Sequence, residues 1–121
     1  MKDIIRWGMI GCGNVAETKS GPALYNADGS ALEIVMSRNK TQVEDFTKRH
    51  GIKNWTVNAD EVIFSNNIDA VYVATPPDSH LYYAKLVAKS GKHLLLEKPL
   101  ARNLEEAEEL IDCCKEANIT L

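Results

Sequence analysis

The chain has 121 residues, of which 45% are hydrophobic and 26% are charged, and its net charge is −3. This length suits one ordinary domain with a hydrophobic core, and the composition is that of a soluble globular protein, not of a disordered tail or a fibre. Acidic and basic residues are interspersed, no apolar run approaches the roughly 18 to 20 residues that span a bilayer, and no signal-peptide pattern opens the chain, so we expect a cytoplasmic protein that binds neither nucleic acid nor membrane.

The first third of the chain begins with a strand and a glycine turn. An apolar strand is predicted over residues 4–10, and it leads directly into the turn formed by residues 11–16. A helix should start at about Asn14. Pro lacks a backbone donor and Gly is flexible, so we expect Ser20-Gly21-Pro22 to interrupt this helix and a second short helix to follow over residues 23–27.

The middle of the chain repeats the alternation. A strand is predicted over 32–36, followed by a helix that Asn39 caps and that ends at His50, with Gly51 just beyond it. A weak third strand is predicted over 55–57. Residues 58–61 have the spacing of a capping box and start a short helix.

The last part of the chain gives two further strands and two helices. A fourth strand over 69–74 ends at two prolines, and a helix over 78–90 follows it. A fifth strand is predicted over 93–96. A second capping-box pattern at 103–106 opens an amphipathic helix to about residue 117, and residues 119–121 are strand-like.

Strict alternation of strands and helices predicts the α/β class, with a doubly wound parallel sheet and helices on both of its faces. Ligands of such sheets bind in the crevice outside the carboxyl ends of the strands. Four segments of chemical interest follow strands and should meet there, namely residues 11–16, 37–38, 75–80 and 97–99.

The glycine turn has the pattern G-x-G-x-x-A. Gly11 permits the tight turn, Gly13 lets the backbone approach a diphosphate, and Ala16 allows close packing of helix and strand. The backbone of Cys12, Asn14 and Val15 completes the predicted cofactor contacts. A packing turn in a domain that binds some other ligand is the alternative.

The end of the second strand bears on the choice of cofactor. An acidic residue there would hold the adenosine 2′-hydroxyl of NAD, but this chain has Ser37 and Arg38. A hydroxyl and a guanidinium can bind a 2′-phosphate, which a carboxylate would repel. NADP is therefore favoured over NAD, with a solvated surface arginine as the alternative.

The three cysteines are odd in number, and Cys113 and Cys114 are adjacent. This spacing fits neither a disulfide framework nor a zinc site. We expect reduced cysteines and no metal.

Together with the glycine turn, Thr75-Pro76-Pro77-Asp78-Ser79-His80 and Glu97-Lys98-Pro99-Leu100-Ala101 resemble the Gfo/Idh/MocA oxidoreductases, named for glucose-fructose oxidoreductase and inositol dehydrogenase. The resemblance covers the whole chain, and E-K-P-x-A is its most specific part. It implies an NAD(P)-binding Rossmann domain over residues 1–121, followed in such enzymes by a larger α/β domain that covers the nicotinamide and often mediates oligomerisation. Nothing in this chain matches that second domain, so we expect a chain truncated before it.

The resemblance also implies a reaction, in which hydride passes between nicotinamide C4 and a carbinol carbon of a sugar, cyclitol or related polyol. Lys98 matches the active-site lysine, which polarises the reacting hydroxyl or passes its proton. Glu97 and Pro99 set the direction of that lysine, Glu97 and Lys98 are also among the expected cofactor-binding residues, and the Lys-Pro peptide is commonly cis. A surface lysine at a strand end is the alternative.

Further site residues follow from the same resemblance. Thr75, Pro76 and Pro77 match the loop under the cofactor's ribose and diphosphate, and His80 matches a position near the nicotinamide, with a local hydrogen bond as its alternative. The family's other catalytic groups, an aspartate and a histidine, belong to the second domain. We therefore expect this chain alone to be inactive, and the full-length protein to be a homo-oligomer.

Two other functions fit part of these observations. A non-catalytic dinucleotide-sensing module would share the fold, but it needs no lysine beside the nicotinamide. A different dehydrogenase family would share the glycine turn but would not require Lys98-Pro99 after the fifth strand. The role of residues 19–22 is open.

Overall fold

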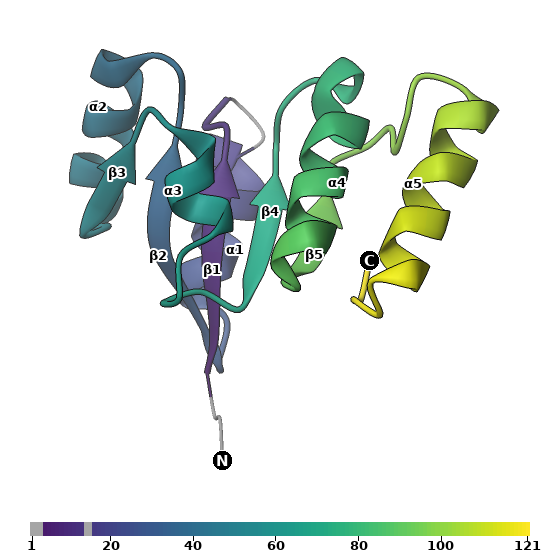
Figure 1. Ribbon diagram of the computed structural model, residues 1–121. Helices are drawn as coiled ribbons and strands as arrows, with labels where there is room; N and C mark the ends of the chain where they lie inside the picture. Colours follow the sequence, from purple (N-terminus) through teal and green to yellow (C-terminus); the bar gives the residue numbers. More distant parts are fainter. Residues whose placement is uncertain (1–3, 14–15) are drawn as a thin grey trace.

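The computed structural model describes residues 4–13 and 16–121. Its centre is a sheet of five parallel strands in the order β3-β2-β1-β4-β5 (Figure 1). The strands are β1 (Ile5–Ile10), β2 (Ser30–Met36), β3 (Asn54–Thr56), β4 (Ala70–Val73) and β5 (His93–Leu96). All five point the same way, so the residues that follow them collect at one edge of the sheet. The predicted α/β class, the parallel sheet and the order of elements along the chain are confirmed.

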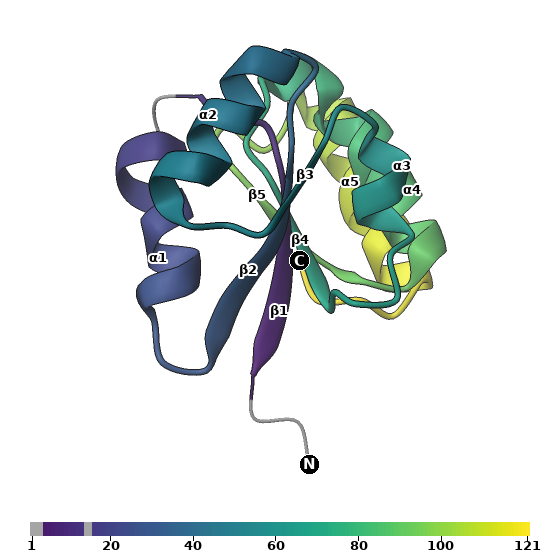
Figure 2. The ribbon, with the colours of Figure 1, turned by 90° about the vertical axis from the view of Figure 1, so that its left-hand side faces the viewer.

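Helices cover both faces of the sheet, as Figure 2 shows from one side. One face carries η1 (Ala16–Ser20), α1 (Gly21–Asn26) and α2 (Lys40–His50). The other carries α3 (Ala59–Ile63), α4 (His80–Ser90) and α5 (Leu104–Glu116), and the short turn η2 (Pro77–Ser79) precedes α4. Among the residues that the structure describes, no helix is both long and apolar enough to cross a bilayer.

A hydrophobic cluster lies on each face. Neighbouring residues of a strand point to opposite faces, so β4 contributes Tyr72 to one cluster and Val71 and Val73 to the other. All three side chains are at most 1% exposed. Strand β4 is therefore held firmly from both sides, next to the strand that carries the glycine turn.

The first helix differs from the prediction. Ser20-Gly21-Pro22 does not separate two helices, because the π-helical turn η1 runs directly into α1. Pro22 lies in the first turn of α1, a position that suits the fixed φ of proline. A Cβ built on Gly21 would lie 2.1 Å from the carbonyl oxygen of Ala16. Glycine thus permits a wider turn at this point, and the expected break was wrong.

Several element ends also differ from the prediction. Residues 77–79 form the separate turn η2, so α4 begins at His80 and not at residue 78. No strand is assigned to residues 119–121, although the carbonyl oxygen of Thr120 accepts a 2.9 Å hydrogen bond from the Leu94 N–H at the edge of β5.

The caps of the helices are mostly as predicted. Asn39 accepts a hydrogen bond from the Gln42 N–H, and Gly51 ends α2 with a φ of 70°. The two capping boxes form only in part. Asn103 accepts from the Glu106 N–H, but the Glu106 carboxylate binds the neighbouring Arg102 instead of returning to Asn103.

Candidate functional site

A hollow of about 320 Å³ lies at the carboxyl edge of the sheet. It is lined by the last residue of β2, by residues that follow β1, β2 and β4, and by one residue each of α2 and α4: Gly11, Cys12, Gly13, Met36, Ser37, Arg38, Asn39, Gln42, Ala74, Thr75, Pro76 and Tyr83. Strand β2, which follows β1 in the chain, pairs with one side of β1, and β4 pairs with the other side. Such a switch point in strand order is where open α/β sheets bind ligands.

The glycine turn forms the floor of this hollow. The Gly11 N–H donates a 2.8 Å hydrogen bond to the carbonyl oxygen of Met36, and Gly11 has a φ of +93°, which favours glycine. A Cβ on Gly11 would meet the carbonyl carbon of Ala74 at 3.2 Å, whereas a Cβ on Gly13 would meet no atom of residues 4–13 and 16–121 within 4 Å. Among these residues, none fills the space beside Gly13.

The other predicted residues of this turn are Cys12, Asn14 and Val15. Asn14 and Val15 lie outside the described residues. Cys12 lines the hollow but is only 6% exposed, and burial raises the pKa of its thiol. The structure thus agrees with a contact through the Cys12 backbone and gives its thiol no nucleophilic role.

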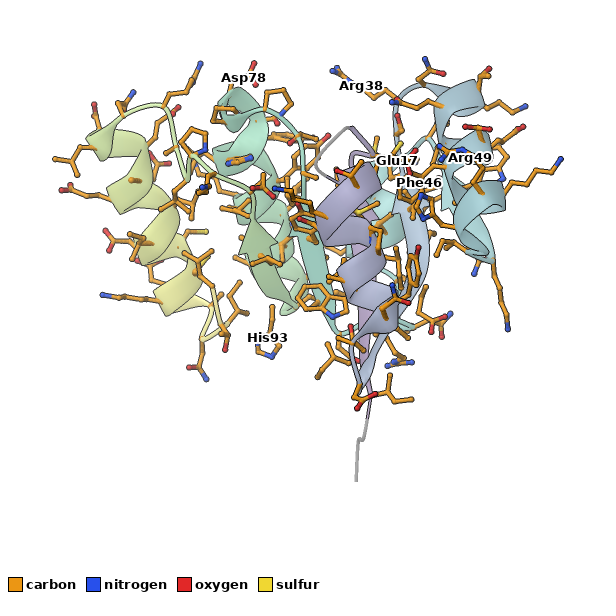
Figure 3. All side chains as sticks on the ribbon, turned by 180° about the vertical axis from the view of Figure 1, so that it is seen from behind. Glu17, Arg38, Phe46, Arg49, Asp78 and His93 are labelled. Atoms are coloured by element: carbon orange, nitrogen blue, oxygen red, sulfur yellow. The ribbon has the colours of Figure 1, made fainter. Side chains whose placement is uncertain are left out.

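Ser37 is placed differently from Arg38. The Ser37 hydroxyl accepts a 3.1 Å hydrogen bond from the Asn39 N–H and donates one of 3.2 Å to Oε1 of Gln42, and the residue is 8% exposed. Its hydroxyl therefore orders the start of α2. Arg38 is exposed at the same edge of the molecule as Asp78 (Figure 3).

A second hollow of about 220 Å³ adjoins the first. Arg38, Thr75, Pro76 and Tyr83 line both hollows, and Asp78 and Ser79 line only the second. Tyr83 is half-buried, and burial is the main cause that raises the pKa of its phenol. Sequence analysis missed Tyr83 because it looks like any half-buried residue of an amphipathic helix. Its spacing of three residues from His80, which puts both on one face of α4, was the one signal that could have found it.

The loop after β4 is internally hydrogen-bonded. Thr75 Oγ1 lies 2.6 Å from Ser79 Oγ, and the Ser79 N–H donates to the carbonyl oxygen of Pro76 at 3.2 Å. Thr75 and Pro76 line the first hollow, and their contact with the cofactor's ribose and diphosphate stays a prediction. Pro77, which begins η2, is not among the residues that line it.

His80 does not lie where a ligand could touch it. Its side chain is fully buried, with Nε2 at 2.8 Å from the carbonyl oxygen of Thr75 and Nδ1 at 3.1 Å from that of Leu100. Both ring nitrogens are used within the protein. The expected contact of His80 near the nicotinamide was therefore wrong. The alternative holds, which is a histidine at a helix start that makes local hydrogen bonds.

Glu97 and Lys98 follow β5 at the same edge of the sheet as the glycine turn (Figure 1). The Lys98-Pro99 peptide is cis, as expected. Lys98 is exposed, and it lies beyond β4 from the first hollow. The Glu97 carboxylate accepts a 2.5 Å hydrogen bond from the Tyr72 phenol, which is the main cause that lowers the pKa of Glu97.

The comparisons with known proteins agree with this geometry. The family model described as "Oxidoreductase family, NAD-binding Rossmann fold" matches residues 5–121. The chain belongs to the GFO/IDH/MocA oxidoreductase family.

Among the described residues, no three His, Cys, Asp or Glu side chains gather as a metal site would require.

Two curated relatives in this GFO/IDH/MocA group illustrate the match. The chain is 51% identical over 119 residues to Oxidoreductase P35 of Formosa agariphila, covering 98% of this chain and 37% of that protein. It is 31% identical to the scyllo-inositol 2-dehydrogenase (NADP(+)) IolU of Bacillus subtilis, covering 98% of this chain and 36% of that one. The chain thus spans little more than a third of the length of these relatives.

A solved GFO/IDH/MocA structure superimposes closely on the chain. KijD10, a 3-ketoreductase from Actinomadura kijaniata crystallised with TDP-benzene and NADP, matches with a TM-score of 0.90 and 30% identity. The match covers 98% of this chain and 37% of KijD10. The fold is therefore that of an NAD(P)-binding Rossmann domain.

Proposed function

We propose that this chain is the nucleotide-binding part of an NAD(P)-dependent oxidoreductase that acts on CH–OH groups of a sugar, cyclitol or related polyol. The observation that carries the proposal is the alignment of two loops at one sheet edge. The glycine turn follows β1 and Lys98 follows β5, with only β4 between these strands. The relatives are much longer than this chain, so we expect the chain by itself to bind cofactor without turning over substrate.

NADP(H) is the cofactor that we propose. Arg38 is exposed and lines both hollows, so its guanidinium can reach a phosphate on the adenosine ribose. IolU and KijD10 are described with NADP, which supports the same choice. Ser37 contributes indirectly, because its hydroxyl orders the start of α2 beside Arg38.

Lys98 is the catalytic residue in this proposal. A bound nicotinamide would supply or accept the hydride at C4. The exposed ammonium of Lys98 would donate a hydrogen bond to the oxygen of the reacting carbon, and it could move a proton at that oxygen. The backbone amides around Gly11 and Gly13 would bind the diphosphate and so set the distance between the cofactor and Lys98.

Amide NMR of the ¹⁵N-labelled chain tests both parts of the proposal. NADPH and its fragment adenosine 2′,5′-bisphosphate are titrated separately. Both should shift the resonances of Gly11, Gly13 and Arg38, but only NADPH should shift that of Lys98, because the fragment lacks the nicotinamide. No shift with either compound at millimolar concentration would contradict cofactor binding, and equal shifts of Lys98 with both would contradict its place beside the nicotinamide.

A further inference from the structure

The segment at residues 19–22, whose role the sequence left open, contains Ser20, which acts on the charge of Glu97 beside Lys98. Ser20 is the last residue of the π-helical turn η1 and is half-buried. Its side chain does not cap α1, and it lowers the pKa of both Tyr72 and Glu97. Single π-helical turns within helices are frequent at functional sites.

Tyr72 supplies the second contact. It lies in β4, its side chain is 1% exposed, and its hydroxyl donates a 2.5 Å hydrogen bond to Oε2 of Glu97. Burial is the main cause that raises the pKa of Tyr72 to about 12, so the phenol keeps its proton and remains a donor at neutral pH. A tyrosine fixed in the central part of the sheet is a rigid partner for a residue at a strand end.

The Glu97 carboxylate connects Tyr72 to the backbone of Lys98. Its Oε2 accepts from Tyr72, and its Oε1 lies 3.3 Å from the Lys98 N–H. The Tyr72 phenol is the main cause that lowers the pKa of this carboxylate; burial raises it, while the backbone N–H and the charge of Lys98 and the Ser20 hydroxyl lower it further. The ionised carboxylate thus joins β4 to the loop after β5.

We propose that Tyr72 and Ser20 are positioning residues for Lys98, which they hold through the Glu97 carboxylate without touching the ligand. The inference rests on the proposed function in one respect, because Lys98 is the catalytic residue there. It also gives Ser20 a role, because this residue lowers the pKa of Glu97 and so favours the ionised carboxylate. Glu97 then supports the cofactor site from behind instead of lining it.

The test uses the 121-residue chain without ligand. Tyr72→Phe removes only the hydroxyl, and Ser20→Ala removes the other donor, while Ser20→Thr restores a hydroxyl. Tyr82→Phe is the matched control, because Tyr82 is 63% exposed. Carboxyl ¹³C NMR follows the titration of Glu97, with Glu97→Gln identifying its signal, and ¹⁵N relaxation follows the Lys98 amide.

In Tyr72→Phe we expect the titration midpoint of Glu97 to move to higher pH. We also expect the order parameter of the Lys98 amide to fall from the roughly 0.85 of rigid backbone toward 0.6. Ser20→Ala should show the same changes more weakly, and Ser20→Thr and Tyr82→Phe should resemble the wild type. If the Lys98 amide and the Glu97 midpoint are unchanged in Tyr72→Phe, the inference is wrong.

These readouts need no cofactor, so they separate this inference from the proposed function. Failure of the wild-type chain to bind NADPH would count against the proposed function alone. The amide spectrum shows whether Tyr72→Phe is folded, and we expect it to keep the dispersion of a folded chain. If this variant is unfolded, Ser20→Ala is compared with Ser20→Thr by the Glu97 titration midpoint and the Lys98 order parameter.

Discussion

The buried imidazole of His80 and the carbonyl oxygen of Thr75 are joined by a 2.8 Å hydrogen bond to Nε2. The other ring nitrogen reaches the carbonyl oxygen of Leu100 at 3.1 Å. Thr75 lines the candidate cofactor hollow, and Leu100 follows the Lys98-Pro99 peptide. One side chain therefore connects two loops of the site that are 25 residues apart in the sequence, counted from Thr75 to Leu100.

Replacing His80 with Ala should destabilise the chain and weaken cofactor binding together. The change removes the ring N–H that donates to one of these two carbonyl oxygens and opens a cavity where the buried ring lay, so we expect the free energy of unfolding to fall by about 2–4 kcal/mol. His80→Gln can still donate to one carbonyl and should lose less. Urea unfolding followed by circular dichroism measures both variants.

The control for this prediction is His93→Ala. His93 is exposed at the opposite end of the molecule (Figure 3), where its ring accepts a hydrogen bond from the Thr120 N–H. Its loss should change the unfolding free energy by less than about 1 kcal/mol. Equal losses of unfolding free energy in the two alanine variants would show that the contacts of His80 stabilise the fold no more than those of an exposed histidine.

The two glycines of the turn should respond differently to alanine. Gly13→Ala meets no atom of the described residues within 4 Å, so stability should change by no more than about 0.5 kcal/mol while NADPH binding weakens at least about tenfold, or about 1.4 kcal/mol. Gly11→Ala must adopt a φ of +93° next to the Ala74 backbone and should lose about 1–3 kcal/mol of stability as well. Thermal melts and NADPH fluorescence titrations compare the two. Unchanged NADPH affinity in Gly13→Ala would argue that the turn only packs.

The sequence predicted the parts of the site that depend on strand order alone. Residues that follow parallel strands must meet at one edge, so Gly11, Arg38 and Thr75 could be placed together without any knowledge of side-chain packing. Lys98 could be placed at that edge for the same reason. The contacts of Asn14 and Val15 stay predictions.

The sequence could not predict contacts that depend on how distant elements pack. Tyr72 looks like any apolar strand residue, and nothing in its neighbours shows that its hydroxyl meets Glu97. His80 was misjudged because its partners are backbone carbonyls, which every residue has. The Ser20-Gly21-Pro22 segment was misread because a π-helical turn and a helix break use the same residues.

Arg38→Ala should weaken NADPH binding selectively. Hydrogen bonds that involve a charged group contribute about 1.5–3 kcal/mol, so the affinity for NADPH should fall about 10- to 100-fold, with little change for NADH. Lys48→Ala is the matched control, since it removes an exposed positive charge from the far end of α2. Fluorescence titration at fixed salt concentration measures all three proteins. An equal loss for NADPH and NADH would mean that Arg38 does not recognise the 2′-phosphate.

Glu17 should make the stability of the chain depend on acid pH. Figure 3 shows Glu17 of η1 beside Arg49 of α2, near the buried ring of Phe46. The hydrogen bond from Arg49 is the largest cause that lowers the pKa of Glu17, and a hydrogen bond with His50 acts in the same direction. Because the folded-state pKa is depressed, this contribution is fully present above the unfolded value of about 4.3 and is lost as the pH falls through the folded value.

Glu17→Gln should therefore be less stable than the wild type at pH 5, and the difference should shrink as the pH is lowered below about 4, where the wild-type carboxylate takes up a proton. Urea midpoints measured at pH 5, 4, 3 and 2 give this difference directly. Glu108→Gln, a change at an exposed residue of α5, is the control and should follow the wild type at each pH. A constant difference between Glu17→Gln and the wild type over this range would mean that the carboxylate's charge is not what joins η1 to α2.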